Sequence, residues 1–195
     1  MQGIKISFPL LGENFILDPP TYVSVLGIQV YYYAVIIAAG FLLAILYILK
    51  RRDAFGLTQD SVLDMFIICV PSGIIGARLY YVLFNPTDYF GAGKWLNIFN
   101  VRQGGLAIYG GVIAAVIAVL IYSRKKKIPT AVFFDVGALG LLIGQAVGRW
   151  GNFINREAYG AETDVPWRMG LSSVGSTVYV HPTFLYESLW NIIGF

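Results

Sequence analysis

The segment GRWGNFINREAYG, residues 148–160, carries several side chains that could bind a ligand or take part in a reaction. Its arginine, Arg149, has a guanidinium that can bind a phosphate through two hydrogen bonds. The same segment carries the carboxamide of Asn152, the carboxylate of Glu157, and glycines that let backbone N–H groups approach a ligand. Each of these has a structural alternative, since arginines anchor helix ends at membrane interfaces and asparagines form turns. Together they indicate an anion-binding site.

A second arginine, Arg78, lies about 9 Å before the end of a long apolar stretch, at 1.5 Å per helical residue. Ionisable groups at such depth are costly and are functional candidates by default. Arg78 must reach the surface, pair with an acid, or face a polar cavity. A structural ion pair and a substrate contact both remain open for this residue.

The composition indicates a membrane protein. Of the 195 residues, 57% are hydrophobic and only 13% are charged, compared with about 25% charged in soluble proteins. These values disfavour a soluble enzyme, a disordered chain and a nucleic-acid-binding module. The single cysteine, Cys69, excludes an internal disulfide and a cysteine metal cluster, and its apolar surroundings favour a packing role.

Uncharged stretches of about 20 residues cross a hydrocarbon core of about 30 Å as helices. A final stretch from residue 183 is too short to cross, and we expect it to begin a fifth helix in a sequence cut off at its C-terminal end. The expected fold is therefore all-α, a polytopic helical integral membrane protein with four complete spans and a partial fifth. It forms one transmembrane domain over residues 1–195. The expected spans are about 30–49, 61–84, 104–122, 131–147 and, in part, 183–195.

Basic clusters set the expected orientation. KRR at residues 50–52 and RKKK at residues 124–127 fall in two short connections on one side of the membrane. The positive-inside rule places both in the cytoplasm and the N-terminus outside. This orientation places the polar residues at the ends of the expected spans near the outer leaflet. A cationic, tyrosine-lined pocket there suits an anionic phospholipid. These residues are Tyr33, Arg78, Tyr109, Arg149, His181 and Glu187.

Glycines at positions 137, 140, 144 and 148 lie on one face of the fourth expected span. Spacings of three and four residues are typical of helices that pack closely in membranes. The stripe therefore predicts close contact with a neighbouring helix rather than a ligand site.

Three motifs carry a resemblance to a known family: GRWGNFINREAYG, HPTFLYESLWN at 181–191 and GGLAIYGG at 104–111. Together they closely resemble the bacterial prolipoprotein diacylglyceryl transferases, over essentially the whole chain. The resemblance implies transfer of the diacylglyceryl group of phosphatidylglycerol to the lipobox cysteine thiol of a prolipoprotein. A thioether forms and glycerol phosphate is released. It also implies a multi-pass protein of the bacterial plasma membrane, with its active site towards the outer leaflet.

The resemblance also assigns residues. Arg149 becomes the phosphatidylglycerol-binding arginine, and Tyr33 matches a functionally important tyrosine of the first helix. Asn152, Glu157 and Gly160 are signature positions expected to shape the same site.

The sequence departs from the family pattern in two ways. Many relatives carry a histidine, proposed as the catalytic base, where this chain has Tyr109. A tyrosine is a poor base at neutral pH unless a cation such as Arg149 or Arg78 lowers its pKa. His181 is the alternative base, although in HPT it can simply structure a helix entry, with the proline and a capping threonine. Relatives also continue past Phe195 through further helices that hold another important arginine.

The implied reaction needs a substrate thiolate and stabilisation of a departing phosphate, and we expect no metal and no cofactor. A non-catalytic membrane protein that binds or transports lipids is the competing interpretation, and it predicts polar residues spread through the membrane thickness. A phospholipid headgroup transferase using the same arginines is a second enzymatic alternative. Nucleic acid is not an expected partner.

Overall fold

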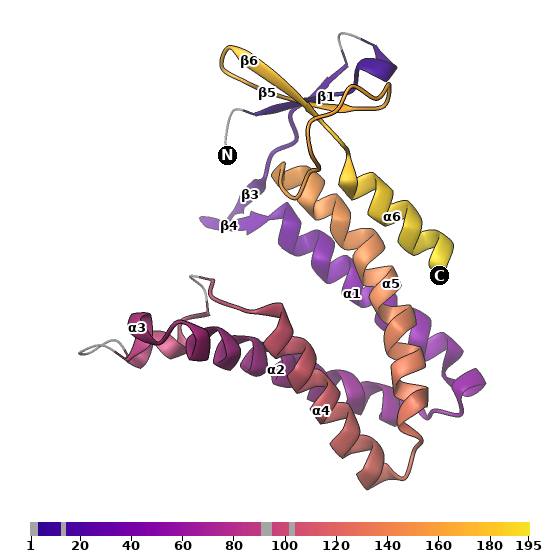
Figure 1. The fold of residues 1–195 in the computed structure, drawn as a ribbon. Coiled ribbons are helices and arrows are strands. Elements are labelled where there is room, and N and C mark those ends of the chain that lie inside the picture. Colours follow the sequence, from indigo (N-terminus) through magenta and orange to yellow (C-terminus); the bar gives the residue numbers. More distant parts are fainter. Residues whose placement is uncertain (1–3, 13–14, 91–94, 102–103) are drawn as a thin grey trace. The chain divides into compact units, whose positions relative to one another are not determined.

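The computed structural model describes residues 4–12, 15–90, 95–101 and 104–195 (Figure 1). The chain forms two compact units, Met1–Tyr47 with Gly137–Phe195, and Ile48–Val136.

Three helices contribute to the first unit: α1 (Tyr32–Arg51), α5 (Thr130–Asn155) and α6 (Thr183–Gly194). Helices α1 and α5 run in opposite directions and approach closely, since a Cβ on Gly40 would lie 3.1 Å from Cβ of Val147. Helix α6 is fastened to α5 by Ser188, whose hydroxyl donates to the carbonyl of Ala146 at 2.8 Å. The beginnings of α1 and α6 and the end of α5 therefore lie together.

A four-stranded antiparallel sheet belongs to the same unit, with strand order β2-β1-β5-β6. Its strands come from both ends of the chain, and the early and late strands lie side by side in Figure 1. The strands are β1 (Lys5–Ser7), β2 (Ile16–Leu17), β5 (Met169–Ser173) and β6 (Ser176–Val180). A separate hairpin leads directly into α1 and consists of β3 (Tyr22–Val25) and β4 (Ile28–Tyr31).

The core of the first unit lies between this sheet and the helix ends. Ile6 of β1 and Val180 of β6 are almost fully buried and pack in one cluster with Phe184 of α6. Phe153, near the end of α5, packs against the same cluster. Apolar contact therefore holds the sheet over the end of α5 that carries the motif GRWGNFINREAYG.

The second unit is built on two antiparallel helices, α2 (Gln59–Phe84) and α4 (Ile108–Lys126), with a short α3 (Pro86–Tyr89) after α2. Glycines let the two long helices touch, because a Cβ on Gly110 would lie 2.3 Å from the carbonyl oxygen of Gly76. Helix α2 begins at a capped turn, where Oγ1 of Thr58 accepts the N–H of Ser61 at 3.1 Å.

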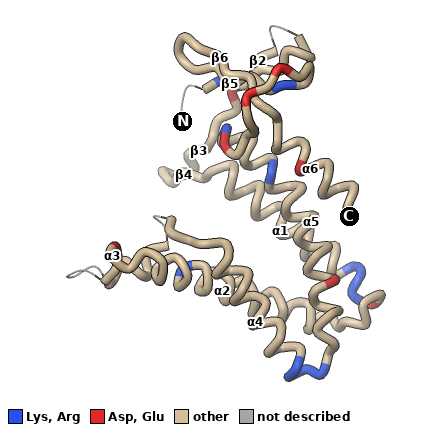
Figure 2. The backbone as a smooth tube through the Cα atoms, viewed as in Figure 1, with Lys and Arg blue, Asp and Glu red and all other residues tan. Residues whose placement is uncertain are grey.

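Basic residues gather around the α1–α2 and α4–α5 connections (Figure 2). The end of α4 lies beside the start of α2, because Nζ of Lys126 is 3.4 Å from Oδ2 of Asp64. Tyr122 also donates to Asp64, at 2.8 Å. The two basic connections therefore share one end of this helix pair.

Within the described residues, four helices are long and apolar enough to cross a membrane: Tyr32–Phe55 (α1 with the short turn after it), Gln59–Phe84, Ile108–Lys126 and Thr130–Asn155. The expectation of a mainly helical membrane protein is confirmed. The exact number of spans and the side of the N-terminus stay predictions, as does the single transmembrane domain.

Three details differ from the expectation. Helix α5 continues to Asn155 rather than ending near residue 147, because GRWGNFIN contains no proline and Phe153 packs in the core. Helix α4 begins at Ile108 rather than near residue 104, because Gly104 and Gly105 have φ of 85° and 74°. No strands were expected, yet the first unit contains short ones that pair across the chain.

The glycine stripe of α5 is only partly a contact face. A Cβ on Gly148 would lie 3.2 Å from Cδ1 of Ile37, whereas a Cβ on Gly137 or Gly144 would meet nothing within 4 Å. The tight glycine crossing is instead the one between α2 and α4.

Candidate functional site

The turn that ends α5 holds Glu157 between two residues in the left-handed region. Arg156 has φ of 55° and Ala158 has φ of 51°. Such backbone costs on the order of 1–3 kcal/mol for a residue that is not glycine, and it persists where surrounding structure enforces it, often at functional sites. The surrounding structure therefore holds the backbone around Glu157 in this unfavourable conformation.

Two side-chain amides hold the carboxylate of Glu157. Oε1 accepts from Nδ2 of Asn152 at 3.0 Å and from Nδ2 of Asn155 at 3.2 Å. The backbone N–H of Glu157 donates to the carbonyl of Asn152 at 3.0 Å. Hydrogen bonds to an ionised carboxylate are stronger than neutral ones. Oε2 has no hydrogen-bond partner in the part of the chain that the structure describes, so this oxygen is available to a ligand.

Arg149 lies one helical turn before Asn152 and forms an ion pair between its Nη2 and Oε2 of Glu187 on α6. The Arg149 side chain is 28% exposed and that of Glu187 is 48% exposed. A guanidinium has five N–H donors. No other hydrogen bond of Arg149 is found among the described residues, so most of its donor capacity is unused.

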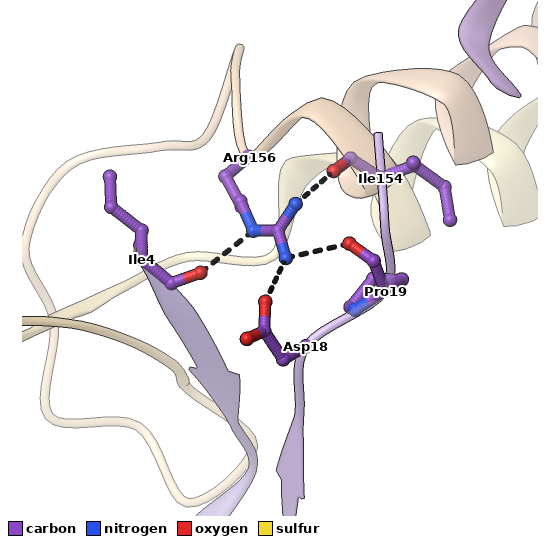
Figure 3. Close-up of polar contacts among 5 residues, drawn as sticks. All are labelled: Ile4, Asp18, Pro19, Ile154 and Arg156. Atoms are coloured by element: carbon purple, nitrogen blue, oxygen red, sulfur yellow. Dashed lines mark hydrogen bonds and ion pairs between the residues drawn. The ribbon is translucent and has the colours of Figure 1, made fainter. Parts of the chain in front are cut away.

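Arg156 provides a contrast, since its guanidinium is 3% exposed and serves as a structural fastener (Figure 3). Its Nη2 donates to Oδ1 of Asp18 at 2.8 Å, and three further bonds go to carbonyl oxygens. Those carbonyls belong to Ile4, Pro19 and Ile154, each at 2.8 Å. Arg156 thereby ties the N-terminal segment to the end of α5.

Arg78, in the second unit, is saturated in the same way. Its guanidinium makes five hydrogen bonds, all to backbone carbonyls, at 2.5–3.1 Å. It also lies 4.9 Å from the ring centroid of Tyr89. The carbonyls are those of Asn97, Ile98, Asn100, Gly104 and Gly105. Backbone carbonyls of the segment between α3 and α4, rather than an acid, therefore compensate this buried charge, and a substrate contact stays a prediction.

The glycines of GGLAIYGG are explained by these contacts. Gly104 and Gly105 have left-handed backbone, and their carbonyls face Arg78. Gly110 and Gly111 allow the close crossing with α2. Tyr109, between the two pairs, is 70% exposed, and its hydroxyl has no hydrogen-bond partner within the described ranges.

Tyr33 lies against the motif that carries Arg149. A Cβ on Gly151 would lie 2.8 Å from Cδ2 of Tyr33, so the glycine makes room for the ring. Gly151 falls between Arg149 and Asn152, so Tyr33 contacts the motif near its beginning, between these two residues.

Gly160 and His181 join the two motif segments of the first unit. The N–H of Gly160 donates to the carbonyl of His181 at 3.0 Å, and the N–H of His181 donates to the carbonyl of Ala161 at 3.1 Å. A Cβ on Gly160 would lie 2.8 Å from Cβ of His181, so a side chain at position 160 would push the two segments apart. Thr183 does not cap α6 with its side chain; its hydroxyl instead donates to the carbonyl of Ala158 at 2.5 Å.

The imidazole of His181 is part of a hydrogen-bond chain. Nε1 of Trp167 donates to the hydroxyl of Tyr186 at 2.6 Å, and that hydroxyl lies 3.1 Å from Nδ1 of His181. Because an indole N–H only donates, the Tyr186 proton is free to point at His181. The hydroxyl of Tyr186 can donate to Nδ1 or accept from it, according to the tautomer of the imidazole.

The first unit thus brings together most of the residues singled out in the sequence: Tyr33, Arg149, Asn152, Glu157, Gly160 and His181. Arg78 and Tyr109 belong to the second unit. Sequence reasoning noted the depth of Glu187 but not its partner, and it missed the roles of Asn155 and Tyr186. No group of three or more His, Cys, Asp or Glu side chains suited to a metal ion occurs in the described ranges.

Comparison with known proteins points to one family. Residues 20–195 match the sequence model of the family described as prolipoprotein diacylglyceryl transferase. Similar proteins are the phosphatidylglycerol–prolipoprotein diacylglyceryl transferases of Clostridioides difficile (44% identical over 168 residues) and Enterococcus faecalis (42% over 178 residues). The protein of the same name from Bifidobacterium adolescentis is 39% identical over 188 residues.

The aligned regions cover 86–88% of this chain but a smaller share of the length of each relative. The chain spans 65% of the C. difficile protein, 63% of the E. faecalis protein and 56% of the B. adolescentis protein. It therefore corresponds to less than two thirds of each of these three relatives.

Proposed function

Because the chain belongs to the prolipoprotein diacylglyceryl transferase family, we propose that it moves the diacylglyceryl group of phosphatidylglycerol onto the cysteine thiol of a prolipoprotein lipobox. The names of the similar proteins support both substrates. The products are a thioether-linked lipopeptide and glycerol phosphate, and this is the first step of lipoprotein maturation.

The observation that carries the proposal is the unused donor capacity of Arg149. The guanidinium groups of Arg78 and Arg156 donate hydrogen bonds to several fixed acceptors of the protein, whereas Arg149 has one partner, Glu187, among the described residues. A partly exposed guanidinium with spare donors is suited to grip a lipid phosphate through two hydrogen bonds. We therefore assign the phosphate of phosphatidylglycerol to Arg149.

The reaction is balanced without a cofactor. The substrate thiol loses its proton, and its sulfur forms a bond to the terminal glycerol carbon of the diacylglyceryl group. The bond between that carbon and the phosphate oxygen breaks, and the phosphate departs with one more negative charge. Arg149 stabilises that growing charge, an effect that is strongest where water is excluded.

The remaining site residues shape the pocket or handle the proton. Asn152 and Gly160 hold the turn that presents the free carboxylate oxygen of Glu157, which suits a hydroxyl of the glycerol headgroup. Tyr33, Tyr109 and His181 are the candidates for receiving the thiol proton. Of these, His181 has a partner for Nδ1, the hydroxyl of Tyr186.

The site is proposed to face the outer leaflet of the bacterial plasma membrane. Helix α1 has Tyr33 in its first turn and Lys50 and Arg51 in its last. Helix α5 begins just after the basic residues 124–127 and carries Arg149 and Asn152 near its other end. Basic connections remain cytoplasmic, so both helices carry their site residues to the outer side.

The decisive experiment uses membranes that contain this chain, a lipobox peptide and phosphatidylglycerol. Mass spectrometry is expected to show a diacylglyceryl mass gain on the peptide cysteine. Arg149→Ala should abolish the gain, whereas Arg124→Ala, which removes an exposed arginine from the basic end of α4, should not. Equal membrane insertion of all three proteins is the control.

Other outcomes separate the alternatives. Full activity of Arg149→Ala would overturn the assignment of the phosphate to this residue. No mass gain from the unmodified chain, with retained binding to phosphatidylglycerol vesicles, would favour a non-catalytic lipid-binding or transport protein. A gain of headgroup on another acceptor would favour a headgroup transferase.

A further inference from the structure

Glu187 is held in place on both sides along α6. The preceding residue, Tyr186, accepts from Trp167 at 2.6 Å and lies 3.1 Å from His181. The following residue, Ser188, accepts from Nε1 of Trp150 at 3.2 Å and donates to the carbonyl of Ala146. These contacts fix the register of α6 against α5, and they place the Glu187 carboxylate opposite Arg149.

This ion pair is poorly suited to a role in stability. Both side chains are partly exposed, and exposed ion pairs add little to folding free energy. Arg149 also differs from Arg78 and Arg156, because a single carboxylate is its partner among the described residues, whereas Arg78 is held by carbonyls and Arg156 by carbonyls together with Asp18. The negative charge of the Glu187 carboxylate therefore affects how strongly the Arg149 guanidinium binds an anionic ligand.

The proposed reaction changes the charge of the group at Arg149. The phosphodiester of phosphatidylglycerol carries one negative charge. When the carbon–oxygen bond breaks, the released glycerol phosphate is a phosphomonoester, which carries about 1.5 to 2 negative charges at pH 7. An arginine alone would therefore hold the product more strongly than the substrate.

We propose that Glu187 is a specificity-determining counter-charge, which lowers the affinity of Arg149 for dianionic glycerol phosphate more than for the monoanionic lipid and thereby promotes product release. The inference rests on the proposed function. The carboxylate repels the second product charge, while the spare donors of Arg149 still bind a singly charged phosphate. Glu187 acts through Arg149 and is a positioning residue rather than a catalytic one.

The test compares Glu187→Gln with Glu187→Asp in membranes that contain the full chain. Glu187→Gln keeps the shape of the side chain and removes its charge, so glycerol phosphate should bind and inhibit at about tenfold lower concentration. Steady-state turnover should fall while the first turnover keeps its rate. Glu187→Asp keeps the charge and should resemble the unmodified chain.

Glu162→Gln is the matched control, since Glu162 is an exposed glutamate of the same unit. It should leave both the inhibition and the turnover unchanged. An unchanged or weakened affinity of Glu187→Gln for glycerol phosphate would overturn the inference and leave Glu187 with a purely structural role.

A second measurement needs no variant and keeps the inference open to refutation if Glu187→Gln fails to fold. Direct binding of glycerol phosphate to the unmodified chain is compared with binding of its monoanionic methyl ester. The proposal expects less than about a twofold preference for the dianion, and a preference of about tenfold or more would overturn it. Absence of transfer by the unmodified chain would count against the proposed function, whereas transfer with strong dianion preference would count against the inference alone.

Discussion

Asn152 and Glu157 are joined by two hydrogen bonds in opposite senses. Nδ2 of Asn152 donates to Oε1 of Glu157 at 3.0 Å, and the backbone N–H of Glu157 donates to the carbonyl of Asn152 at 3.0 Å. These two hydrogen bonds close the turn after α5, so the position of the Glu157 carboxylate depends on the Asn152 amide.

We expect Glu157→Gln to lower the transfer rate by about ten- to hundredfold, the equivalent of a hydrogen bond to a charged group. Adding Asn152→Ala should cost little more, because the two side chains depend on each other. Initial rates of the two single variants and the double variant measure this coupling. Effects that simply multiply would show that the two residues act independently.

Arg156→Ala should destabilise the protein by on the order of 3 kcal/mol, because it leaves Asp18 and three carbonyls without their donor. Hydrogen exchange of β1 should accelerate in this variant, since the fastener of the N-terminal segment is lost. Arg124→Ala serves as the control and should leave exchange in β1 unchanged. Unaltered exchange in Arg156→Ala would contradict the structural role of this arginine.

Gly110→Ala should lower the unfolding temperature, because the added Cβ would lie 2.3 Å from both the Gly76 carbonyl and Cβ of Tyr80. Overpacking of this kind costs about 1–3 kcal/mol. Gly137→Ala is matched in chemistry and meets nothing within 4 Å, so it should be neutral or slightly stabilising. Thermal unfolding in one detergent distinguishes the two, and equal effects would refute the tight helix crossing.

Gly151→Ala should impair transfer by moving the ring of Tyr33, whose Cδ2 would lie 2.8 Å from the new Cβ. Gly144→Ala, on the same helix and with nothing within 4 Å, should keep normal activity. Lipid transfer rates and thermal unfolding are both needed, because only a loss of rate without a loss of stability supports a role of Tyr33 in the site. Normal transfer by Gly151→Ala would remove Tyr33 from the proposed site.

Much of the candidate site was predictable because its residues are close in sequence. Arg149, Asn152 and Glu157 fall on one helix end and the turn after it, so local spacing was enough to group them. Apolar run lengths likewise predicted the four long helices, since crossing a bilayer needs about 20 uncharged residues.

Contacts between distant segments were not predictable in this way. The carbonyls that accept from Arg78 belong to residues 19–27 positions later in the chain, and nothing in the composition of that segment marks them as acceptors. Glu187 was noticed for its depth, but its pairing with Arg149 depends on the register that Ser188 fixes between α5 and α6. The strand at Lys5–Ser7 is too short to show an alternating pattern, and its partner β5 begins at Met169.

The position of β1 has a consequence for biosynthesis. This strand, which is synthesised before the long helices, is an interior strand of the sheet, between β2 and β5. Its neighbour β5 is synthesised only after α1, α2, α4 and α5. The N-terminal strand must therefore wait with one edge unpaired while four long apolar helices are inserted, and the sheet over the site closes as a late step of assembly.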